Sequence, residues 1–167
     1  MGTRLYPCTT DSSVICRLLN VSERSYQLHQ EIEAWQEERG GMFFTPKDEE
    51  MMEVNGQRMM RLPDGKWTAL DQYDDYGYAL YCWRKENYPE VDEIENFQLY
   101  GWGRVNFPES WKDTKINWDG HEEGDYPLGS YCCGRTKNPE EVLTILQYND
   151  VDLNGVGVEE LGGLFWS

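Results

Sequence analysis

The stretch from Glu86 to Tyr126 combines a large excess of acidic residues with recurring aromatic ones. It holds eleven carboxylates against three basic side chains, so half of the chain's net charge of −16 lies in one quarter of its length. The whole chain contains 23 aromatic residues, which is far more than a disordered acidic tail carries. We therefore expect the chain to fold. The aromatic residues of this stretch are Tyr88, Phe97, Tyr100, Trp102, Phe107, Trp111, Trp118 and Tyr126.

A chain of 167 residues is long enough for one domain with a substantial core. We expect residues 1–167 to form a single α+β domain with an antiparallel, hairpin-rich sheet and about three helices. Local signals support the helices. Asp11 or Ser12, Ser22 and Asn138 are good N-terminal caps for helices, each followed by apolar residues at helical spacing. Pro89 opens a further short helix over 90–96.

The strongest strand signal is Asn55-Gly56, which lies between two mixed apolar segments and predicts a β-hairpin. Residues 71–83 fit either a helix or a strand. From 106 to 126 glycine and proline recur too often for long elements, and we expect mostly loop. Further strands are expected over 3–8, 42–44, 67–70, 97–105 and 129–133.

Charge excludes several classes of function. With 31 acidic against 15 basic residues, the chain is not expected to bind nucleic acid directly, because phosphates attract Lys and Arg and repel carboxylates. Anionic membrane surfaces are disfavoured by the same charge. The N-terminal residues lack the apolar segment of a secretory signal, and no apolar run approaches a membrane span. We expect a cytoplasmic protein.

Motifs for catalysis and for cofactors are absent from the sequence. The patterns GxSxG, GxxxxGK[ST], HExxH and GxGxxG do not occur, and two histidines leave little material for a catalytic triad. His29 is expected to be partly packed on its helix. The five cysteines are odd in number and none forms a CxxC pair, so reduced thiols are expected. We expect no cofactor, and the chain is more consistent with a binding protein than with an enzyme.

Charge and aromatic content together favour an acidic, non-catalytic inhibitor that occupies a basic surface of a partner protein. Basic grooves that normally hold nucleic acid are among such surfaces, and on one of these the chain would act as a DNA mimic, in the manner of counter-defence proteins of bacterial viruses. Duplex DNA carries one charge per roughly 1.7 Å, so sixteen charges match about 27 Å of duplex. The predicted contact residues are two acidic patches and three aromatic anchors. They are Glu90, Asp92, Glu93 and Glu95; Asp119, Glu122, Glu123 and Asp125; and Trp102, Trp111 and Trp118.

Two alternatives stay open at this point. Paired carboxylates among aromatic residues in 86–126 are also typical of a carboxylate- or metal-dependent small hydrolase or a carbohydrate-binding protein. Residues 150–155 resemble the opening of an EF-hand calcium loop, but the twelfth position holds Leu161 and not the bidentate Glu. A calcium site there would use Asp150, Asp152, Asn154 and Glu160.

Overall fold

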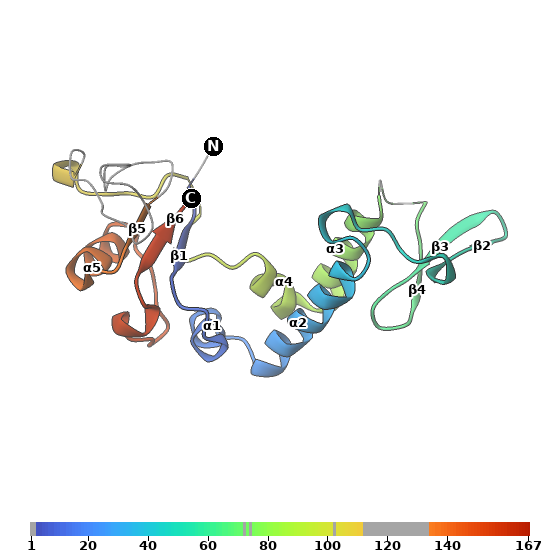
Figure 1. The fold of residues 1–167 in the computed structure, drawn as a ribbon, viewed down its shortest axis with the longest axis horizontal. Helices are drawn as coiled ribbons and strands as arrows, with labels where there is room; N and C mark the ends of the chain where they lie inside the picture. The colour runs from blue at the N-terminus through green and yellow to red at the C-terminus, as the bar shows by residue number, and fades with distance from the viewer. Residues whose placement is uncertain (1–2, 72, 74, 102, 112–133) are drawn as a thin grey trace. The chain divides into compact units, whose positions relative to one another are not determined.

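The computed structural model describes residues 3–71, 73, 75–101, 103–111 and 134–167. The chain divides into two compact units: a terminal unit of residues 1–20 and 97–167, and a central unit of residues 21–96. Both contain helices and a three-stranded antiparallel sheet, which confirms the α+β class (Figure 1). The expectation of a single domain over 1–167 is not tested by this division and stays a prediction.

The terminal unit is built around β6, which lies between β1 and β5 and runs antiparallel to both (Figure 1). Trp166 of β6 is opposite Leu5 on one side and Gly134 on the other, and it is only 1% exposed. A Cβ on Gly134 would lie 2.1 Å from the Trp166 ring, so glycine leaves the space that the indole fills. The elements of this unit are β1 (Leu5–Pro7), α1 (Ser12–Leu19), η3 (Glu109–Trp111), β5 (Gly134–Thr136), α5 (Pro139–Tyr148), η4 (Val158–Leu161) and β6 (Leu164–Trp166).

Helices α1 and α5 begin where the sequence predicts. The side chain of Asp11 accepts a hydrogen bond from the Ser13 amide, and that of Asn138 accepts one from the Glu140 amide. The apolar faces of both helices pack on the sheet in one core cluster. Its buried members are Leu5, Val14, Leu18, Val105, Val142, Ile145, Leu146, Val156, Leu161, Leu164 and Trp166.

The strand expected over 97–105 is wrong for the residues described there. This segment makes a single bridge, between Tyr100 and Leu5, and otherwise runs irregularly. Backbone hydrogen bonds join its first part to β1: the Leu5 amide donates to the Tyr100 carbonyl at 2.8 Å, and the Leu99 amide donates to the Leu5 carbonyl at 2.7 Å. Side chains hold its end, where Thr3 accepts a hydrogen bond from the Val105 amide and the buried Asn149 side chain bonds both backbone groups of Asn106. A mixture of backbone and side-chain hydrogen bonds therefore takes the place of a regular ladder.

The central unit combines three α-helices with a meander of three short strands. Helix α4 lies beside both α2 and α3 (Figure 1). Counting both units, the described residues form five α-helices, more than the three or so expected. Within the described ranges, none of the helices has the length and apolar character needed to cross a bilayer. The central elements are α2 (Glu23–Glu37), η1 (Gly41–Phe43), η2 (Asp48–Glu50), β2 (Met51–Val54), β3 (Gln57–Arg61), β4 (Trp67–Ala69), α3 (Tyr76–Asn87) and α4 (Pro89–Glu95).

The hairpin of the central unit confirms the Asn55-Gly56 signal. Both residues have positive φ, 53° and 80°, and Val54 pairs with Gln57 across the turn. Positive φ at both central positions is the requirement of the type I′ turn, whose twist matches that of the strands. β4 continues the sheet on the far side of β3, so the order is β2-β3-β4.

Residues 42–44 form no strand, and that expectation is wrong. Gly40 and Gly41 both adopt positive φ, 105° and 61°, and turn the chain into the single 3₁₀ turn η1. Phe44 then packs on Trp35 with ring centroids 5.3 Å apart, whereas Met42 and Phe43 face solvent. The apolar run therefore divides into one core residue and two surface residues.

Glu50 is the most deeply buried charged residue among those described, at 1% exposure. Its two carboxylate oxygens accept hydrogen bonds from Arg39 Nε and Nη2, at 2.7 and 2.8 Å, and one also accepts the Lys47 amide at 3.0 Å. Arg61 Nη2 lies 3.7 Å away. The pair joins the end of α2 to the start of the sheet. The hydrogen bonds from Arg39 hold the pKa of Glu50 below its ordinary value.

Substituting Glu50→Gln is expected to lower the free energy of unfolding by about 3 kcal/mol, because the buried Arg39 guanidinium then loses its buried counter-charge and keeps only the exposed Glu38 carboxylate nearby. Urea unfolding followed by tryptophan fluorescence measures the difference. Its neighbour Glu49 is exposed, so Glu49→Gln is the matched control and should change stability by less than about 0.5 kcal/mol. Equal stability of the two variants would contradict this role of Glu50.

The stabilisation by Glu50 is also expected to depend on pH. Because its pKa is lowered in the folded state, the unfolded chain takes up the proton first as the pH falls. The contribution is therefore complete above the ordinary carboxyl pKa of 4.5 and is lost as the pH falls below it. We expect the difference in unfolding free energy between wild type and Glu50→Gln to shrink as the pH falls from about 6 to about 3, which is roughly 1.5 units either side of that pKa. A difference independent of pH would contradict the assignment.

Candidate functional site

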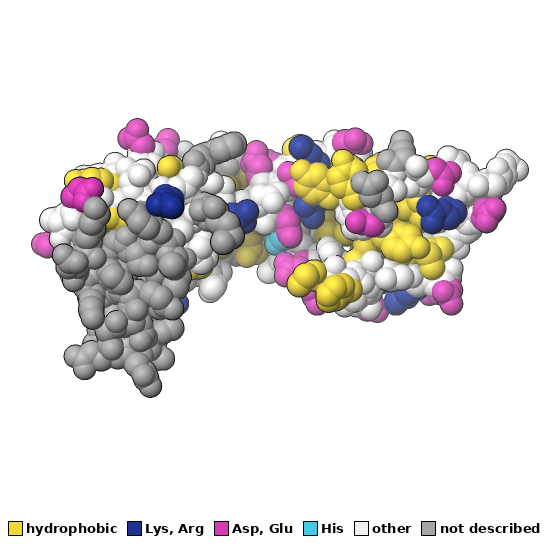
Figure 2. All heavy atoms as spheres, turned by 90° about the horizontal axis from the view of Figure 1, so that it is seen from above, with side chains coloured by type: hydrophobic (Ala, Val, Ile, Leu, Met, Phe, Trp, Pro, Cys, Tyr) yellow, Lys and Arg dark blue, Asp and Glu magenta, His cyan; other side chains and the backbone are white. Residues whose placement is uncertain are grey.

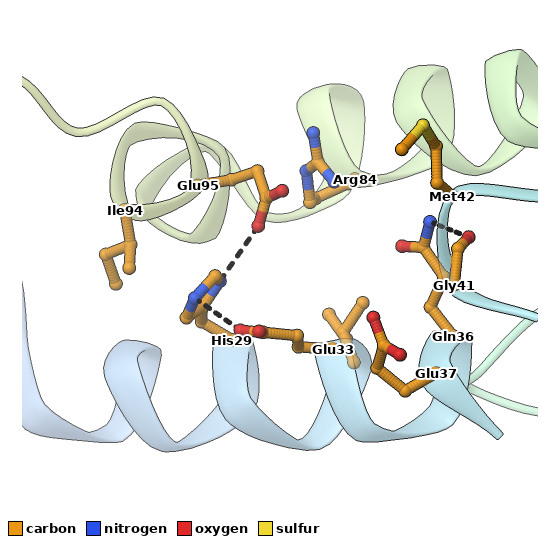
Figure 3. Close-up of a pocket in the computed structure, with 10 residues that line it drawn as sticks. His29, Glu33, Gln36, Glu37, Gly41, Met42, Arg84, Ile94 and Glu95 are labelled. Atoms are coloured by element: carbon orange, nitrogen blue, oxygen red, sulfur yellow. Dashed lines mark hydrogen bonds and ion pairs between the residues drawn. The ribbon is translucent and has the colours of Figure 1, made fainter. Parts of the chain in front are cut away.

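A pocket of about 350 Å³ opens between α2, η1, α3 and α4 in the central unit (Figure 3). Helix α2 supplies one face of it, since positions 29, 33, 36 and 37 fall on the same side of a helix. η1 supplies Gly41 and Met42 at one end, and α4 supplies the facing wall. Three carboxylates of two helices meet there: Glu33, Glu37 and Glu95. The pocket is therefore electronegative at its rim.

His29 lies between two of these carboxylates, as Figure 3 shows. Its Nε2 is 3.2 Å from Glu33 and its Nδ1 is 3.4 Å from Glu95, and the side chain is 14% exposed. The imidazole therefore links α2 to α4, and His29 is partly buried, as expected from its helix.

Arg84 lines the pocket from α3 and is 8% exposed. Its Nη2 lies 3.3 Å from Asp92 of α4, and its Nε has no hydrogen-bond partner. A buried guanidinium with one carboxylate nearby is costly to desolvate and holds that carboxylate in place. Arg84 thus joins α3 to α4 behind the acidic rim.

The predicted patch on α4 divides into structural and exposed members. Glu90 accepts hydrogen bonds from the hydroxyls of Ser25 and Ser22 at the start of α2, and these, the Ser25 bond first, lower its pKa. Asp92 pairs with Arg84, and Glu95 pairs with His29. Glu93 is exposed. The structure therefore brings Glu95 into the pocket and gives Glu90 and Asp92 a part in joining the helices.

Most of the other predicted contact residues lie outside the described residues: Trp102, Trp118, Asp119, Glu122, Glu123 and Asp125. Trp111 is described. It is half-buried, packs against the core of the terminal unit and lies beside Phe107, with centroids 6.4 Å apart. The hydrolase or carbohydrate-binding alternative for 86–126 stays a prediction.

The residues of the predicted calcium loop occupy a turn after α5. Asp150 and Asn154 have positive φ, and Asp152 accepts the Asn154 amide at 2.8 Å. Glu160 bonds elsewhere: its carboxylate pairs with Arg17 at 2.5 Å and accepts the Gly157 amide, which lowers its pKa. In the described part of the chain, no group of three His, Cys, Asp or Glu side chains is arranged to hold a metal ion.

Sequence reasoning missed the pocket itself. His29, Glu33 and Glu37 recur every four residues, which is a readable signal for one helix face. The Gly40-Gly41 pair that follows is a second signal, because it predicts a turn in place of the strand expected there. Neither signal shows that α4 lies opposite, since that contact joins residues more than fifty positions apart.

Substituting Asp92→Asn is expected to lower the free energy of unfolding by about 2 kcal/mol, because Arg84 then lies buried without a counter-charge. Glu93→Gln, on the same helix but exposed, is the control and should have little effect. The double variant Arg84→Met, Asp92→Leu should recover most of the loss, since it removes both charges. Urea unfolding of the four proteins checks this, and an Asp92 variant as stable as wild type would refute it.

Comparison with known proteins assigns no family to this chain. No protein-family model matches the chain. No curated protein and no solved structure matches it either. The function proposed below therefore depends on the residues of this chain alone.

Proposed function

We propose that this protein binds a basic surface of a partner protein and inhibits it by occupying a surface that otherwise holds nucleic acid. The observation that carries the proposal is the meeting of Glu33, Glu37 and Glu95 around one pocket. Arg84 also lines the pocket but is paired with Asp92, so carboxylates are in excess at the rim and attract ligands of the opposite sign. Lysine and arginine side chains of a partner are the complementary groups.

The charge balance of the central unit supports binding to a basic partner surface. Its sequence holds 18 acidic and 8 basic residues, a net charge of −10. Six of the eight basic side chains lie within 4.0 Å of a carboxylate of the same unit. These cations are therefore already balanced within the unit, and the carboxylates in excess are left to act on molecules outside it. Basic surfaces that hold phosphates are the surfaces most attracted by such a charge.

Neutralising two carboxylates of the pocket tests whether negative charge attracts the partner protein. For Glu33→Gln, Glu37→Gln we expect association with the partner to slow about tenfold and its salt dependence to become flatter, because steering by charge acts on the association rate. The control removes two exposed charges from the terminal unit, Asp150→Asn and Glu159→Gln, and should leave the rate nearly unchanged. Surface plasmon resonance at several salt concentrations gives both quantities.

The partner itself is found by immobilising wild type and the two charge variants and passing cell lysate over each at low and then high salt. A nucleic-acid-binding protein that salt releases, that the pocket variant does not retain, and that duplex DNA displaces supports the proposal. Retention of the same proteins by all three chains, or of none, contradicts it. A partner that DNA does not displace would contradict nucleic-acid mimicry in particular.

A further inference from the structure

Two neighbouring apolar side chains project from the turn that borders the acidic pocket. Met42 is 88% exposed and Phe43 is 83% exposed, the highest values among the large apolar residues described. Single exposed apolar residues are common on protein surfaces. Two adjacent ones that large are unusual. Figure 2 shows that hydrophobic side chains gather over the central unit, with carboxylates among them.

The turn that carries these two residues, hereafter the Met42–Phe43 knob, is firmly held. The Phe43 amide bonds the Gly40 carbonyl at 3.1 Å, and the Gln36 side chain bonds the Gly41 carbonyl at 3.1 Å. Directly after the knob, Phe44 is buried against Trp35. A Cβ on Gly40 would lie 2.9 Å from the Phe43 carbonyl oxygen, so this turn needs glycine. A fixed turn presents its side chains with little loss of entropy on binding.

Acidic groups line the pocket beside the Met42–Phe43 knob. Met42 lines the same pocket as Glu33, Glu37 and Glu95. The nearby cations are already engaged within the unit: Arg39 with Glu50, Arg84 with Asp92, and Lys47 with Glu38 at 3.3 Å. The surface beside the knob therefore has negative charge in excess, and a complementary surface needs an apolar hollow with lysine or arginine at its edge.

We infer that the Met42–Phe43 knob is the apolar anchor of the interface, and that it enters an apolar hollow edged by basic residues on a partner protein. The inference rests on the proposed function and adds the residues that supply affinity, since buried apolar anchors dominate interface energetics. Charge disfavours the other occupants. A second copy of this chain would bring its own carboxylates against these, and an anionic membrane would repel them.

The test uses three labelled peptides of equal length and fluorescence anisotropy. The first is an amphipathic leucine–lysine peptide, the second replaces its leucines with glycine and serine, and the third replaces its lysines with glutamate. For Met42→Ser, Phe43→Ser we expect about tenfold or greater loss of affinity for the first peptide and unchanged binding of the second. Wild type should not bind the third. Leu143→Ser, Tyr148→Ser removes two exposed apolar residues of the terminal unit and is the matched control.

The outcomes separate the two proposals. In one outcome, the knob variant binds the leucine–lysine peptide as tightly as wild type, while the variant Glu33→Gln, Glu37→Gln has lower affinity for both lysine peptides. This outcome refutes the anchor and leaves the proposed electrostatic function standing. If the charge variant changes neither, the proposed function fails. Urea midpoints equal to wild type establish that the knob variant is folded. A dimer in light scattering, or sedimentation with phosphatidylcholine vesicles, that disappears in the knob variant would also overturn the inference.

Discussion

Glu50 is a carboxylate removed almost completely from water, and the central unit needs cations around it. An isolated carboxylate in a protein interior is strongly unfavourable. Arg39 therefore has to lie where both of its donors reach Glu50, and the chain between them has to close into a short loop. The same guanidinium lies over the Trp35 ring at 4.0 Å and donates to the Trp35 carbonyl. One ion pair thus fixes the end of α2, the loop after it and the 3₁₀ turn that leads into the sheet.

The loop closed by this pair is the one that carries Met42 and Phe43. Its glycines turn the chain outward, and the Thr45 amide bonds the Arg39 carbonyl at 2.9 Å, so the loop returns to the residue from which it left. The exposed side chains are therefore held in place by a buried network at the base of the loop. Acidic residues in the same unit divide accordingly into buried or paired ones that hold structure, such as Glu50 and Asp92, and exposed ones, such as Glu37 and Glu93.

Features governed by neighbouring residues could be predicted from the sequence, and those governed by distant contacts could not. The caps Asp11, Ser22 and Asn138 and the Asn55-Gly56 turn follow from local hydrogen bonding and allowed φ, and all are present. The apolar run 42–44 has the composition of a strand, but two left-handed glycines before it decide otherwise. The acidic residues of the sequence indicated Glu95 as a contact residue by their number alone. That it faces His29 depends on how α4 packs on α2, which no local pattern contains.

The sheet of the terminal unit has a consequence for how the chain is made. β1 obtains its only strand neighbour among the described residues from β6, some 160 positions later in the sequence. During synthesis Leu5, Val14 and Leu18 therefore emerge long before the strand and the core residues that cover them. The central unit, by contrast, is complete once residue 96 has been added. Contacts that close so large a loop form slowly, so we expect the nascent N-terminal segment to need a chaperone or a transient partner until β6 has been synthesised.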